Sequence, residues 1–204
     1  MTEPFVEDVP PESLPEPTHQ GSDDVLGEWT SDSDLPDGGS ENVQAIEFSA
    51  MGSSAGSAAV ANARTQAGVS EQPPGSNCGV PHDRYVVWIA GAGVGCVPWC
   101  AYFVGWAFDT SSLGNHDHRS PWGNSGYVPW IYQWARNHNK IVSRPEHGDV
   151  FFLNPTDPQH SHMGLVAGAD PVAGTIYTCE GNWSDRVLSQ VRAYRSGVYT
   201  FARI

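Results

Sequence analysis

Basic residues are absent from the first quarter of this 204-residue chain. Residues 1–50 contain thirteen aspartates and glutamates and no lysine or arginine, so this segment carries the whole formal charge of −13. Large apolar residues are scarce there, while proline, serine and glycine are common. Such a composition buries too little surface to offset the entropy lost on folding. We therefore predict an acidic, disordered tail, in which only the short runs 24–29 and 44–51 are candidates for docking.

Long hydrophobic runs are absent as well. No stretch approaches the roughly 18 to 20 apolar residues that span a membrane. The N-terminus also lacks the basic start and apolar core of a secretory signal, so we expect synthesis in a cytoplasm without export by that route. Residues 51–204 contain ten acidic and ten basic residues. The stretch 53–204 has the ordinary size of one domain.

The compact part of the chain is predicted to place helices before strands. Helical spacing of apolar residues predicts helices at 56–69, 80–91, 98–108 and 128–139. Short apolar runs between turn residues predict strands at 149–153, 162–168, 175–180, 187–194 and 198–203. This order indicates an α+β fold, with helices packed on one face of a largely antiparallel sheet. The glycine-rich segment 91–95 follows no strand and carries no lysine, so we interpret it as a lead into the next helix rather than a phosphate site.

A cysteine at the start of an apolar helix is the strongest chemical signal. The segment PWCAYFVGWAF (98–108) places Pro98 at the expected first helical position and Cys100 in the first turn. Trp99 and Phe103 follow at helical spacing and predict a buried helix. The dipole and the free N–H groups at a helix start favour a thiolate. Cys100 is therefore a candidate nucleophile, and the alternative is a buried structural cysteine.

A cysteine nucleophile needs an imidazole nearby. Of the eight histidines, His162 is the best placed, because it opens a predicted apolar strand on which Gly164 leaves space beside its ring. His160 shares that face and is the reserve candidate. His116 and His118 form one His-x-His pair without further spaced ligands, so we interpret them as part of a polar loop rather than a metal site.

The imidazole in turn needs an acceptor that orients it. Glu180 ends the predicted strand TIYTCE, and pairing with an imidazole explains an acid in an otherwise apolar strand. The alternative is an acid that points from the strand end into water. By strand alternation Glu180 faces the same way as Thr178, while Cys179 faces the other way and is predicted to be structural.

Five motifs in this order resemble the CHAP domain, the cysteine- and histidine-dependent amidohydrolase/peptidase family of bacteriophage endolysins and bacterial wall hydrolases. They are AGVSEQPPGSN (67–77), Cys100 in WCAYFVGW, GDVFF (148–152), His162 in HMGLV, and Glu180 with Asn182 in CEGN. The resemblance covers residues 53–204. It implies a papain-like fold of the NlpC/P60 superfamily and hydrolysis of peptidoglycan amide bonds, by either an amidase or an endopeptidase.

The resemblance also implies a role for each residue of the catalytic set. Cys100 attacks the carbonyl, and His162 takes its proton and later protonates the leaving amine. Glu180 holds the imidazole in the right tautomer, and Asn182 assists that orientation or contacts substrate. N–H groups at the helix start meet the oxyanion, and water clears the acyl-enzyme without a cofactor. Some CHAP domains bind calcium through acids ahead of the nucleophile, but the interval 85–99 contains no such acid, so no metal site is predicted there.

The expected partner is bacterial peptidoglycan, without nucleic acid and without membrane insertion. Trp99, Trp122 and Trp183 are predicted to stack on its sugar rings. Tyr127 is a further candidate, whereas core packing is favoured for Trp130. No separate wall-binding domain is visible, and an acidic tail is repelled by anionic wall polymers. Targeting is therefore expected to come from a virion or an accessory protein.

Synthesis in a bacterial host cytoplasm bears on the remaining cysteines. Cys78 and Cys96 are able to pair, but a reducing compartment gives little reason to expect a disulfide. The site of action is expected to be the cell wall, reached by an endolysin or by a lysin carried in a phage virion.

Two other functions remain open from the sequence. One is another papain-like thiol hydrolase, such as an NlpC/P60-type endopeptidase or an effector toxin; the Glu-x-Asn pattern at Glu180 and Asn182 favours CHAP over it. The other is a catalytically silent structural or wall-binding module of a phage. A silent module has no need of Cys100, His162 and Glu180 together, so the intact set argues against it.

Overall fold

A computed structural model describes residues 52–111, 119–195 and 197–204. The predicted acidic tail and the pair His116 and His118 lie outside the described residues. No helix in the described ranges is long and apolar enough to cross a membrane.

The helices come first in the chain, as predicted. They are α1 (Ser54–Arg64), a short π-helix (His82–Val86) that continues into α2 (Val87–Ala90), α3 (Cys100–Ser111) and α4 (Val128–Asn137). The side chain of Ser53 caps α1 by accepting a hydrogen bond of 2.9 Å from the N–H of Gly56. The predicted helix extended to residue 69, but α1 ends at Arg64 and turns follow it.

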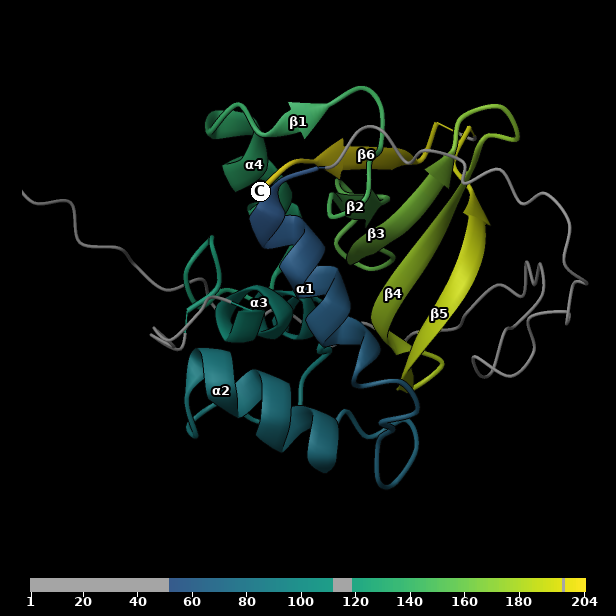
Figure 1. The fold of residues 1–204 in the computed structure, drawn as a ribbon. Coiled ribbons are helices and arrows are strands. Elements are labelled where there is room, and N and C mark those ends of the chain that lie inside the picture. The colour runs from purple at the N-terminus through teal and green to yellow at the C-terminus, as the bar shows by residue number, and fades with distance from the viewer. Residues whose placement is uncertain (1–51, 112–118, 196) are drawn as a thin grey trace, which may run out of the picture.

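The strands form one antiparallel sheet in the order β1-β6-β2-β3-β4-β5. They are β1 (Ile141–Val142), β2 (Val150–Leu153), β3 (His162–Asp170), β4 (Thr175–Trp183), β5 (Arg186–Ala193) and β6 (Tyr199–Ala202). The last five confirm the predicted strands, and the two-residue β1 was missed because it is too short to show alternation. In Figure 1, α1, α2 and α3 lie on one side of this sheet, which is the predicted α+β architecture.

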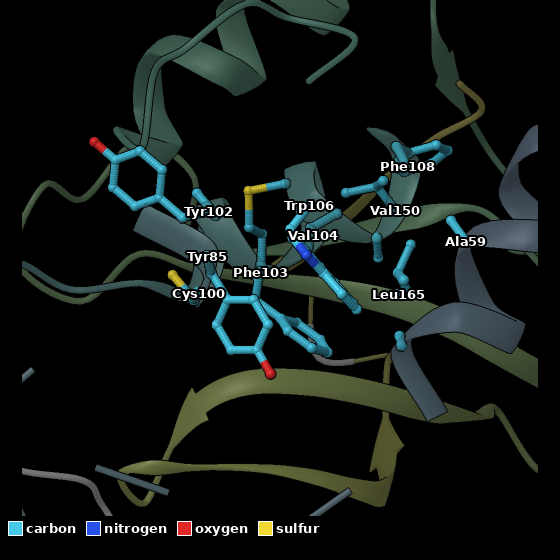
Figure 2. Packing of buried hydrophobic residues seen from close by; sticks show 14 of the residues in the cluster. Ala59, Tyr85, Cys100, Tyr102, Phe103, Val104, Trp106, Phe108, Val150 and Leu165 are labelled. Carbon is cyan, nitrogen blue, oxygen red and sulfur yellow. The ribbon is translucent and has the colours of Figure 1, made fainter. Parts of the chain in front are cut away.

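The core is thickest around α3, which packs against α1, β3 and β4. Side chains from the helices and from one sheet face form the main cluster, part of which is drawn in Figure 2. Phe103 of α3 is fully buried there, and the ring of Tyr85 lies 5.2 Å from it, edge to face. A smaller cluster covers the other sheet face and consists of Phe151, Val166, Ile176 and Phe201. The apolar segment beginning at Cys100 is therefore a buried central helix, as its composition predicts.

The close approach of α3 to β4 depends on a glycine. A Cβ atom at Gly181 would lie 2.5 Å from the Cβ of Phe103, inside van der Waals contact. Because Gly181 lies between Glu180 and Asn182, the absence of a side chain there lets α3 approach the strand that carries both candidates.

We expect Gly181→Ala to lower the free energy of unfolding by about 1–3 kcal/mol, since the added methyl group overpacks the contact with Phe103. Urea unfolding measures the change. The matched control is Gly93→Ala, because a Cβ atom at Gly93 meets no atom within 4 Å. Equal stability of the two variants would contradict the assigned contact.

Candidate active site

Cys100 is the first residue of α3. The carbonyl of Trp99 accepts the first helical hydrogen bond, from the N–H of Phe103 at 2.9 Å. Pro98 therefore precedes the helix instead of occupying its first position, which corrects the sequence expectation. The first N–H groups of a helix have no partner within the helix, so Cys100 lies beside free donors. Its side chain is 5% exposed, and Figure 2 shows it at the edge of the main cluster.

His162 begins β3, on the sheet face opposite the main cluster. Its Nε2 lies 2.8 Å from Oε2 of Glu180, and the two side chains are 1% and 0% exposed. A carboxylate only accepts hydrogen bonds, so Nε2 carries the proton and donates. The other ring nitrogen, Nδ1, is buried without a hydrogen-bond partner. This nitrogen is therefore the one available for proton exchange.

Burial alone would lower the pKa of His162, but two neighbours outweigh it. The side chains of Cys100 and Glu180 raise the pKa of the imidazole to about 9. Both favour the imidazolium through charge, and Glu180 also does so through its hydrogen bond to Nε2. Cys100 is thus close enough to influence the ring, and the structure brings the predicted nucleophile and base together.

Glu180 is buried among donors. Its Oε1 accepts hydrogen bonds from the hydroxyl of Thr178 and from Nε2 of Gln190, the latter at 2.9 Å. Arg192 donates to both oxygens, each at 2.6 Å. Burial raises the pKa of this carboxyl, but Arg192 and then His162 lower it to about 2. Glu180 is therefore ionised at neutral pH, and its contact with Thr178 confirms that the two share a face.

Asn182 does not hydrogen-bond to the imidazole. Its Nδ2 donates to Oδ1 of Asn77 at 3.1 Å, and its backbone has a φ of 60°, in the left-handed region. The structure therefore shows no direct contact by which Asn182 orients the ring, and its role in contacting substrate stays a prediction. Asn77 in turn donates its N–H to Glu71, whose other oxygen accepts from the indole of Trp99 at 2.7 Å. This chain of contacts links Asn182 to the residue before Cys100.

The predicted aromatic contacts are only partly supported. Trp99 is 0% exposed and Trp122 is also buried, so both pack in the core where no sugar ring reaches them. Trp183 lies beside the site, with its ring centre 5.1 Å from that of His162. Trp130 is 47% exposed and Tyr127 is exposed too, so the preference for core packing at Trp130 is wrong.

His160 is not part of the site. Its Nδ1 lies 2.8 Å from Asp157, and its side chain is exposed. Because His160 is two residues before His162, strand alternation predicts that both lie on one sheet face. His160, however, lies in the turn before β3 and not in the strand. Alternation therefore does not apply to it.

Cys78 and Cys96 form a disulfide, contrary to the expectation from a reducing compartment. The bond joins the segment that contains Asn77 to the loop that leads into α3. Cys179 remains free and buried, and its sulfur lies 3.6 Å from the hydroxyl of Ser189. It packs in the main cluster, away from Glu180, as alternation predicts.

Several residues of the site were missed by the sequence analysis. Gln190 and Arg192 stand two apart on β5, so strand alternation puts them on one face, but nothing in the sequence gives their register against Glu180. Glu71 and Asn77 lie in the motif 67–77, but nothing in that motif indicates their contacts with Trp99 and Asn182. Within the described residues, no group of three or more histidine, cysteine, aspartate or glutamate side chains is placed to hold a metal ion.

An antiparallel sheet with a central helix that begins at a cysteine, beside a buried histidine and carboxylate, is a papain-like α+β arrangement. Residues 91–182 match the family model described as CHAP domain, and the chain carries a CHAP domain over this range. The matched range includes all four predicted catalytic residues. No curated protein and no solved structure matches the chain. A CHAP domain implies a hydrolase of the peptidoglycan amidase or peptidase type.

We expect the protein to lose stability as the pH rises from about 6.5 to about 9. The pKa of His162 is raised in the folded state, so its contribution is fully present below 6.5 and is lost as the ring deprotonates near 9. Urea unfolding measures this loss, which is at most about 1.4 kcal/mol per pH unit. In His162→Gln the decline should be shallower, and an identical decline would contradict the assignment.

Proposed function

We propose that the protein hydrolyses an amide bond of peptidoglycan by a thiol mechanism, with Cys100 as nucleophile. One observation carries the proposal: His162 is held by Glu180 through Nε2, while its unpartnered Nδ1 belongs to a ring whose pKa is raised by Cys100. A purely structural histidine is expected to have both nitrogens satisfied. A cysteine beside a cationic imidazole at a helix start is also in the environment that produces reactive thiolates.

The proton path follows from the hydrogen bonds. Because Nε2 is held by Glu180, Nδ1 of His162 takes the proton from the Cys100 thiol. The sulfur attacks the amide carbonyl carbon, and a C–S bond forms. Nδ1 then protonates the leaving nitrogen, the C–N bond breaks, and an amine departs. Water, deprotonated by the same nitrogen, attacks the thioester and releases a carboxylate and the thiol.

The negative charge on the carbonyl oxygen needs donors during both attacks. Cys100 is the first residue of α3, so its own N–H and that of Ala101 lie at the end of the helix where donors are unpaired. We propose that these N–H groups stabilise the oxyanion, aided by the positive end of the helix dipole.

Peptidoglycan is the substrate class implied by the CHAP match. Trp183 borders the candidate site and Tyr127 and Trp130 are exposed, so we retain Trp183 and Tyr127 as candidate substrate contacts and add Trp130. That the protein acts at the cell wall as a phage endolysin or virion lysin remains a prediction from the family resemblance. The distinction between an amidase and an endopeptidase is made by the products.

The first test is digestion of purified peptidoglycan from several bacteria, with the fragments identified by mass spectrometry. We expect Cys100→Ala to abolish release of fragments, because no other group supplies the nucleophile in this mechanism. New amino termini in the stem or crossbridge identify an endopeptidase, and free lactyl groups identify an amidase. Cys179→Ala is the matched control, since this buried cysteine lies away from Glu180. Undiminished digestion by Cys100→Ala would refute the mechanism.

Glu180 and Asn182 are expected to differ in importance. Glu180→Ala removes the direct partner of the imidazole and leaves a buried histidine unpaired, so kcat should fall by about 100-fold or more. Asn182→Ala removes a contact with Asn77 and acts on the ring only indirectly, so the loss should be about tenfold or less. Steady-state hydrolysis of a soluble wall fragment measures both, and a greater loss in Asn182→Ala would contradict the order.

A further inference from the structure

Arg192 forms a two-point contact with the carboxylate that holds the candidate base. Its Nε donates to Oε1 of Glu180 and its Nη2 donates to Oε2, both at 2.6 Å. Oε2 is the same oxygen that accepts from His162. The guanidinium therefore fixes the plane of the carboxylate and shares Oε2 with the imidazole.

The sheet register makes this contact a specific arrangement. Arg192 on β5 stands opposite Ile176, whereas Glu180 stands opposite Leu188, so the arginine side chain runs along the sheet face to reach it. On its way the guanidinium lies over the ring of Trp183, 4.0 Å from the ring centre. The side chain of Arg192 is only 9% exposed, so it is shielded from solvent and from any substrate.

We propose that Arg192 is a positioning residue, which holds the Glu180 carboxylate by two hydrogen bonds so that His162 presents Nδ1 to the Cys100 sulfur. This inference rests on the proposed function of that site. Arg192 acts through Glu180 and not on the substrate, so its removal should reduce kcat without a matching change in KM.

Desolvation is the physical reason that Glu180 needs this partner. A carboxylate removed from water tends to bind a proton, and a protonated Glu180 no longer attracts the imidazolium. A planar guanidinium supplies two parallel charge-assisted hydrogen bonds, which a lysine does not. A buried ion pair often contributes little net stability, so a positioning role explains its presence better than stability does.

Other charged or titratable groups also face this centre. His162 approaches Glu180 from β3, and Cys100 of α3 acts on the imidazole. Tyr199 of β6 interacts with Arg192. Cys179 of β4 lies on the other sheet face, where burial and, to a smaller extent, the charge of Glu180 raise the pKa of its thiol. Only His162 and Arg192 hydrogen-bond to the carboxylate among these groups. Arg192 lowers the pKa of Glu180 more than His162 does, so the loss of Arg192 should move the ionisation of Glu180 further than the loss of His162.

The test compares the pH dependence of kcat/KM in the wild type and in Arg192→Met. Without the guanidinium, burial raises the pKa of Glu180. As the pH is lowered, Arg192→Met should therefore lose activity at a higher pH than the wild type does. We expect this acid limb to move up by about one pH unit or more and kcat at neutral pH to fall by roughly 10- to 100-fold. An unmoved limb with unchanged kcat would overturn the proposal.

Arg195→Met is the matched control. It removes an exposed arginine that donates to the carbonyls of Pro171 and Val172, away from Glu180, so it should keep the wild-type profile. If Arg192→Met does not fold, Arg192→Lys takes its place. Lysine keeps the positive charge but loses the two parallel hydrogen bonds of the guanidinium. We therefore expect kcat to fall by about 3- to 10-fold, while the acid limb of the kcat/KM profile stays nearly unmoved. Wild-type kcat in that variant would overturn the proposal.

A second readout separates this inference from the proposed function. The rate at which iodoacetamide alkylates Cys100, followed by mass spectrometry of its peptide, reports thiol reactivity without any substrate. If the wild type digests no peptidoglycan, the proposed function fails, yet the alkylation profile still tests Arg192. An acid limb for alkylation that moves up in Arg192→Met supports the inference, and identical profiles refute it.

Discussion

The burial of one carboxylate is the constraint on which the rest of the site depends. Glu180 has no access to water, and a charge in that position is tolerated only when donors surround it. The neighbouring strands supply most of those donors: His162 comes from β3, and Gln190 and Arg192 come from β5, while Thr178 of β4 itself adds another. The order of these strands around β4 is therefore a chemical requirement as well as a topological one. Moving β5 by one residue would turn both donors to the other face.

Small residues set the distance between the helix and the sheet. Gly181 leaves room for Phe103 of α3, and a Cβ atom at Gly164 would lie 2.7 Å from the ring of Phe151. That ring in turn packs beside His162, with 5.9 Å between their centres. The space that Gly164 was predicted to leave for the imidazole is thus taken by Phe151, whose ring packs against the imidazole. Precise placement of the base comes from packing as much as from hydrogen bonds.

Much of the site was predictable because it follows local rules. Alternation along TIYTCE correctly put Glu180 with Thr178 and Cys179 on the opposite face, since side chains alternate in any regular strand. The same rule failed for His160, which lies in a turn. The substrate contact expected of Trp99 was wrong, because its indole is buried and bonds to Glu71, which is 28 residues away. The disulfide between Cys78 and Cys96 was also missed, because an expectation about compartment says nothing about which sulfur atoms lie side by side.

The sequence by itself determined the order of helices and strands, the buried helix that begins at Cys100, and the pairing of His162 with Glu180. These features follow from periodicity and from motifs that lie within a few residues of each other. Only the tertiary structure decided that Arg192 holds Glu180, that Nδ1 of His162 is the unpartnered nitrogen, and that Asn182 contacts Asn77. Contacts of this kind depend on strand register and on side-chain direction across the sheet. The spacing of residues within one segment determines neither.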